Sequence, residues 1–132
     1  MLMAKMYGVV MVAAMTFVVP AQGKETTSTQ IDLPAAGKPG AYKGTIRGHE
    51  SAEYVFQGAA GQKLRIDMKA DNRSTFFNLV QDGKPEAVFV GSVDGNTYHA
   101  ALPVTGTYRV KVYLMRNAAR QNIRAKYELR LR

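Results

Sequence analysis

Hydrophobic and polar side chains alternate strictly along residues 106–115. On an extended chain, one face of this segment carries Tyr108, Val110, Val112 and Leu114. The opposite face carries Arg109, Lys111 and Tyr113. A period of two residues predicts a β-strand with one buried and one exposed face.

The last segment of the chain, residues 126–132, repeats this alternation with Tyr127, Leu129 and Leu131 on one face. Shorter runs of the same kind predict six more strands, over residues 42–47, 53–57, 62–69, 76–81, 87–90 and 97–102. Asp82-Gly83 and Asp94-Gly95 supply turns, and no useful length of the chain has helical periodicity. About eight short strands with one polar face each predict an all-β fold, a single antiparallel β-sandwich.

A polar connection, residues 116–122, joins the two best-defined strands. Consecutive strands usually lie side by side in one sheet. We therefore expect these two strands to form an antiparallel hairpin with the connection at its tip.

The N-terminal segment has the layout of a secretory signal peptide over residues 1–23. Lys5 precedes an apolar run at positions 9–19, and small residues follow before Lys24. Cleavage after Gly23 is the first choice and cleavage after Ala21 the alternative. The apolar run is too short to span a bilayer, so we expect export to the periplasm and no membrane span.

Residues 24–40 are polar and rich in proline and glycine, which predicts a flexible leader before a β-sandwich domain at 41–132. The chain after residue 23 has 17 basic and 10 acidic side chains, a formal charge of +7. Such a domain is attracted to acidic surfaces in general. Export argues against nucleic acid as the partner, and we expect a monomer.

Candidate chemistry is sparse. The chain has no cysteine, which excludes thiol chemistry and cysteine metal sites. Its two histidines, His49 and His99, have no metal-ligand spacing and no accompanying nucleophile motif. The acidic residues are scattered, so no carboxylate pair is evident. The sequence therefore predicts a binding protein that is not an enzyme and needs no metal or cofactor.

The best candidate for binding is the segment Arg116-Asn117-Ala118-Ala119-Arg120. A guanidinium can form two charge-assisted hydrogen bonds with one carboxylate, and small residues between two arginines suit a narrow space. These features fit insertion into an acidic cleft. The alternative is a solvated loop that is polar for solubility.

At these residues the sequence resembles the periplasmic inhibitors of goose-type (g-type) lysozyme. The resemblance runs from about Tyr42 to the end, and its most specific part is the Arg-Asn-x-Ala-Arg box at 116–120. Its other blocks are residues 42–48, 53–56, 60–64, 102–108 and 126–127. Several of these blocks also resemble the β-sandwich accessory domains at the C-terminus of secreted peptidases.

The resemblance to the inhibitors implies a jelly-roll-like sandwich that plugs the substrate cleft of a g-type lysozyme and so protects the bacterial wall. It implies that Arg116 and Arg120 are the inserted groups and that Asn117 shapes the loop between them. The inhibitors have a tyrosine after the glycine that ends the first strand, and His49 occupies that position here. The partner implied is a g-type lysozyme.

A second function stays open. The exposed face with Arg109, Lys111 and Tyr113 could instead bind envelope glycans, which would make the chain an accessory carbohydrate- or envelope-binding sandwich without inhibitory activity.

Overall fold

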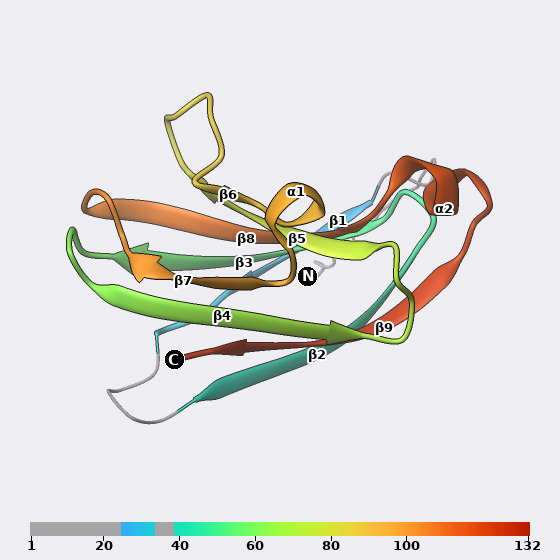
Figure 1. Cartoon of the computed structure of the whole chain (residues 1–132), viewed down its shortest axis with the longest axis horizontal. Coiled ribbons are helices and arrows are strands. Elements are labelled where there is room, and N and C mark those ends of the chain that lie inside the picture. The colour runs from blue at the N-terminus through green and yellow to red at the C-terminus, as the bar shows by residue number, and fades with distance from the viewer. Residues whose placement is uncertain (1–24, 34–38) are drawn as a thin grey trace, which may run out of the picture.

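Two β-sheets pack face to face in the computed structural model, which describes residues 25–33 and 39–132 (Figure 1). The five-stranded sheet has the order β1 (Thr26–Gln30), β3 (Ser51–Gly58), β8 (Gly106–Leu114), β5 (Thr75–Gln81) and β6 (Phe89–Val90). The four-stranded sheet has the order β2 (Gly40–Arg47), β9 (Arg124–Leu131), β4 (Lys63–Ala70) and β7 (Thr97–Ala101). Two short helices, α1 (Gly91–Asp94) and α2 (Arg116–Arg120), lie in connections. The predicted all-β sandwich is confirmed.

The core lies between the sheets and is built from the alternation seen in the sequence. Every side chain assigned to the inner face of β8 is buried, as are Tyr127, Leu129 and Leu131 of β9. Burial of each large apolar side chain contributes roughly 1.5–3 kcal/mol to the free energy of unfolding. The two strands β8 and β9 supply many of these side chains. The hydroxyl groups of Tyr54 on β3 and Tyr127 on β9 are 2.7 Å apart, so a buried hydrogen bond joins the two sheets.

The hairpin prediction was wrong. β8 pairs with β3 and β5 in one sheet, whereas β9 pairs with β2 and β4 in the other. Residues 115–123 therefore cross from one sheet to the other, and part of this connection is helix α2. The alternation of a strand shows which of its faces is buried. Because β8 and β9 bury side chains in the same core from opposite sides, the alternation does not show which sheet each strand belongs to.

The flexible-leader prediction for residues 24–40 was also wrong over Thr26–Gln30. These residues form β1, which pairs in parallel with β3, so the sandwich is not purely antiparallel. All five side chains are exposed, and main-chain hydrogen bonds tie the ends of the strand, from Ser51 N–H to Glu25 O at 2.9 Å and from Ile31 N–H to Val55 O at 2.9 Å. An edge strand held in this way needs no apolar alternation.

The predicted signal peptide and its cleavage site lie outside the described residues, as do residues 34–38 of the predicted leader. Within residues 25–33 and 39–132, no helix has the length and apolar character needed to cross a membrane.

Candidate functional site

Three connections between the sheets meet at one end of the sandwich. They are the β2–β3 turn at residues 48–50, the β4–β5 turn at 71–74, and the α2 connection at 115–123, at the right of Figure 1. Met115 N–H donates to Ser74 O at 2.8 Å, and Gly48 N–H donates to Ile123 O at 2.8 Å. The α2 connection is thus fixed by main-chain hydrogen bonds to both neighbouring turns.

Helix α2 is anchored on its inner side and polar on its outer side. Ala118 and Ala119 are buried in the core, whereas Arg116, Asn117 and Arg120 are exposed. The small residues between the arginines therefore serve to pack a helical turn on the sandwich. Asn122, with a φ of 56°, terminates the turn in the left-handed conformation that commonly ends helices.

The β2–β3 turn is pressed against the end of α2. Gly48 has a φ of 61°, and a Cβ atom there would lie 2.7 Å from Oδ1 of Asn122. Only glycine meets both demands without strain. The turn is closed further by a hydrogen bond from Arg47 N–H to Oε1 of Glu50 at 2.9 Å. This fit places His49 beside α2.

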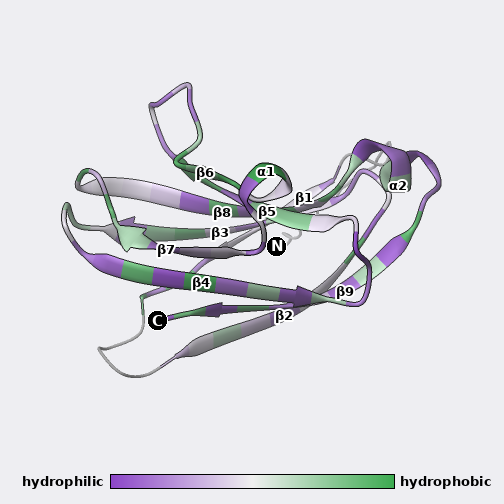
Figure 2. Ribbon diagram, in the orientation of Figure 1, coloured by the Kyte–Doolittle hydropathy of each residue, from purple (hydrophilic) through white to green (hydrophobic). Residues whose placement is uncertain are grey.

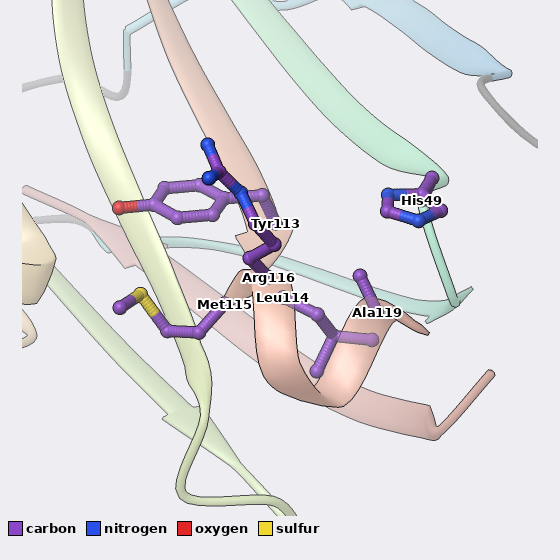
Figure 3. A pocket seen from close by; sticks show the side chains of 6 residues that line it. All are labelled: His49, Tyr113, Leu114, Met115, Arg116 and Ala119. Carbon is purple, nitrogen blue, oxygen red and sulfur yellow. The ribbon is translucent and has the colours of Figure 1, made fainter. Parts of the chain in front are cut away.

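His49 and Arg116 line one open hollow of about 570 Å³, together with Tyr113, Leu114, Met115 and Ala119 (Figure 3). His49 comes from the β2–β3 turn, and the others come from the end of β8 and from α2. The Tyr113 hydroxyl donates to Oδ1 of Asn78 at 3.0 Å, which holds its ring in place. Met115 is 40% exposed and gives the hollow an apolar side chain open to a partner.

Asn117 and Arg120 are coupled to each other on α2. Nη2 of Arg120 donates to Oδ1 of Asn117 at 2.8 Å. This pair, three residues apart on one helical turn, limits the rotamers of the Arg120 side chain. The structure thus brings the four predicted site residues to one end of the molecule, His49 and Arg116 at the hollow and Asn117 and Arg120 beside it.

The arginines at this end have free charges. None of the ion pairs within the described chain involves Arg116 or Arg120. The nearby carboxylates are engaged by backbone donors: Glu50 accepts from Arg47 N–H, and Asp71 accepts from Lys126 N–H at 2.9 Å. The guanidinium groups are therefore available to an external carboxylate.

Tyr113 and Met115 also line the hollow, and the sequence did not predict them there. The alternation along the chain places Tyr113 on the other candidate face and Met115 at the end of a strand. The signal that could have found them is their position directly before Arg116.

The alternative face is largely neutralised by its own residues. Arg109 pairs with Glu53 at 2.9 Å and with Asp82 at 2.7 Å, and Lys111 lies 3.4 Å from Glu53. The hydrogen bond from Arg109 lowers the pKa of the Asp82 carboxyl below its ordinary value. The alternative face therefore has fewer cationic side chains without an ion pair, and so fewer that could bind an anionic glycan, than the α2 end has.

Metal chemistry has no visible site in the part of the chain that the structure describes: no group of three or more histidine, aspartate and glutamate side chains is placed to hold an ion. His99 is exposed on the edge strand β7, opposite Arg65 of β4.

Comparison with known proteins points in one direction. The inhibitor of g-type lysozyme of Escherichia coli (strain K12) is 27% identical over 90 residues, which is 67% of each chain. The chain resembles the inhibitors of g-type lysozyme. No family model matches it.

Solved structures of these inhibitors share the fold. PliG of Salmonella Typhimurium, a periplasmic inhibitor of g-type lysozyme, is 26% identical with a TM-score of 0.61, over 80% of this chain and 96% of that one. PliG of Aeromonas hydrophila has a TM-score of 0.70 at 24% identity, over 81% and 96%. These similar proteins are inhibitors and not enzymes.

The accessory-domain resemblance is confirmed as a likeness of fold. The pre-peptidase C-terminal domain of a Bacillus anthracis collagenase has a TM-score of 0.62 at 20% identity, over 84% of this chain and all of that one.

Proposed function

We propose that this chain is a periplasmic inhibitor of g-type lysozyme that occupies the substrate cleft of the enzyme with its α2 end and so protects the bacterial cell wall. The similarity to inhibitors of this class supports the activity. The observation that supports the location is the placement of His49 and Arg116 at one hollow, with Arg120 beside them.

Arg116 and Arg120 supply the attraction in this proposal. A glycosidase cleft contains catalytic carboxylates, and a guanidinium pairs with a carboxylate through two charge-assisted hydrogen bonds. Neither arginine has to leave a carboxylate partner within the described chain, so little internal energy is lost on binding. Asn117 orients Arg120 through the 2.8 Å hydrogen bond.

The hollow supplies a second part of the contact. His49 can donate a hydrogen bond or stack on a partner, and Met115 offers an apolar surface next to Arg116. A stable protein complex buries about 1,600 Å² in total and takes most of its energy from a few central residues. The β2–β3 and β4–β5 turns lie at the same end and would complete such an area.

Rigidity of the α2 end favours tight binding. Ala118 and Ala119 are buried and Gly48 is fitted against Asn122, so the segment is already ordered before it meets an enzyme. A preformed surface loses less conformational entropy on binding than a flexible loop does.

The test is an inhibition assay of the purified protein against g-, c- and i-type lysozymes in parallel. We expect inhibition of the g-type enzyme and little effect on the other two. Absence of g-type inhibition, together with binding to purified peptidoglycan, would instead support the accessory envelope-binding function.

A further inference from the structure

The outer face of the four-stranded sheet is strongly basic. Its outward side chains are alternate residues of β2, β4 and β9, followed by Arg132, together with the uncharged outward positions of the edge strand β7 (Thr97, His99 and Ala101). Nine are cationic, and we call them the basic face: Lys43, Arg47, Lys63, Arg65, Lys69, Arg124, Lys126, Arg130 and Arg132. Figure 2 shows hydrophilic residues alternating with hydrophobic ones along β4.

This face contains the whole basic excess of the described chain. Asp67 and Glu128 are the acidic residues among its outward positions, so the nine cations leave a formal charge of +7. The described residues as a whole have 15 cationic and 10 acidic side chains, a charge of +5. Everything outside the basic face and its two acids therefore has a charge of −2.

Like charges are neighbours at two places across the strands of this face, whereas Lys43 and Lys69 each lie opposite Glu128 and Asp67 lies opposite Arg130. Arg47 lies opposite Arg124 in the β2–β9 register, and Arg65 exchanges main-chain hydrogen bonds with Arg132. Within the described chain, three of the nine cations form ion pairs: Arg65, Arg130 and Arg132. Facing like charges destabilise a sheet, so the two like-charged pairs are a cost to the fold that an anionic partner would offset.

The shape and composition of the face indicate the kind of partner. The cations extend over three adjacent strands, about 4.8 Å apart, and form a two-dimensional array rather than a line. No tryptophan, tyrosine or phenylalanine occupies its outward positions, so it lacks the stacking surface typical of sugar and single-stranded nucleic-acid sites. The large apolar residues exposed on the described chain, Val93, Val104 and Met115, lie elsewhere.

We propose that the basic face docks the protein on the surface of an anionic phospholipid bilayer, with lipid phosphates as the counter-charges. Binding is electrostatic and peripheral, because none of the large apolar side chains exposed on the described residues lies on this face. Helix α2 lies at the end of the sandwich, so docking leaves Arg116 and Arg120 accessible (Figure 1). This proposal is independent of lysozyme inhibition.

The test is co-sedimentation with vesicles of phosphatidylcholine alone and of phosphatidylcholine with phosphatidylglycerol. We expect binding to the anionic vesicles only, and its loss at 0.5 M salt, where the screening length falls to roughly 4 Å. Insertion of the apolar run at residues 9–19 would appear on both kinds of vesicle and would not mimic this result.

Two triple variants with the same net charge distinguish an effect of the basic face on vesicle binding from an effect of net charge alone. Lys43→Gln/Lys69→Gln/Lys126→Gln removes three exposed cations of the face that form no ion pair within the described chain. Because each basic residue near an anionic bilayer strengthens binding about five-fold, we expect a loss of roughly a hundred-fold. Lys84→Gln/Arg116→Gln/Arg120→Gln loses the same charge outside the face, and we expect a change of less than about five-fold.

Three results would overturn the proposal: equal losses in the two triple variants, equal binding to neutral vesicles, or binding to a soluble acidic polysaccharide without binding to anionic vesicles. Circular dichroism checks that the triple variants fold. Should the first fail to fold, the single variant Lys126→Glu, which reverses one exposed charge, provides the same comparison with Lys84→Glu.

Discussion

His49 and Arg116 line the same hollow although they belong to different connections between the two sheets. The contact between the β2–β3 turn and α2 brings them together. The proposed site is therefore a property of the folded end of the sandwich, and each of its parts can be altered separately.

Replacement of His49 tests whether the β2–β3 turn takes part in binding. We expect His49→Ala to weaken inhibition of a g-type lysozyme by about five-fold, the effect of one ordinary hydrogen bond. His49→Tyr should keep or improve inhibition, because the resemblance implies a tyrosine there. His99→Ala, at an exposed histidine of β7, is the control. Equal inhibition by the His49→Ala and His99→Ala variants would remove His49 from the site.

Gly48 fits closely against Asn122, and this contact positions the turn. We expect Gly48→Ala to lower the free energy of unfolding by about 1–2 kcal/mol more than Gly83→Ala does, measured by urea denaturation. Both glycines have left-handed backbone, with φ of 61° and 85°, but a Cβ at Gly83 meets nothing within 4 Å.

The extra loss of unfolding free energy caused by Gly48→Ala, relative to Gly83→Ala, should disappear in Gly48→Ala/Asn122→Gly, because the obstructing Asn122 side chain is gone. Equal losses at the two glycines would show that the contact with Asn122 is not a constraint.

Much of the sandwich could be predicted from its sequence, because one buried face per strand leaves a period of two. The alternation of β8 and β9 identified their core residues correctly. β1 was missed because its side chains are all exposed and main-chain hydrogen bonds hold it.

The location of Arg116 and Arg120 could be predicted only as a polar connection. Helix α2 has five residues, too few to show a helical period, so the burial of Ala118 and Ala119 was not visible. The hollow depends on which sheet each strand joins, and alternation does not contain that information.

The Tyr54–Tyr127 hydrogen bond couples the two sheets. We expect Tyr127→Phe to cost about 1–3 kcal/mol, because it leaves the buried Tyr54 hydroxyl without its partner. Tyr54→Phe/Tyr127→Phe removes both hydroxyl groups and should cost less than the sum of the two single changes. Chemical denaturation of all four proteins measures this coupling, and strictly additive losses would contradict it.

The Tyr54–Tyr127 pair also makes the free energy of unfolding depend on pH in the alkaline range. Burial, together with the hydrogen bond to Tyr54, raises the pKa of the Tyr127 phenol above its ordinary value of 10.0. As the pH rises, the Tyr127 phenol therefore loses its proton at a lower pH in the unfolded chain than in the folded chain. The contribution of Tyr127 to the free energy of unfolding is complete below pH 10 and falls as the pH rises above it.

Urea unfolding between pH 8 and about 11 should show a shallower decline for Tyr127→Phe than for the unaltered protein. Tyr98, whose pKa is also raised by burial, contributes equally to both proteins. Parallel declines would mean that Tyr127 does not titrate in this way.

In the proposed function, Arg116 and Arg120 provide most of the binding energy for inhibition. The most direct measurement is the inhibition constant of Arg116→Ala/Arg120→Ala against a g-type lysozyme. Its control is Lys43→Ala/Lys84→Ala, which removes the same charge at exposed positions outside the α2 end. We expect a loss of roughly a hundred-fold or more in the arginine variant, since each central charged contact contributes about 1.4 kcal/mol or more, and little change in the control. Undiminished inhibition by the folded arginine variant would show that Arg116 and Arg120 are not the residues that bind the lysozyme.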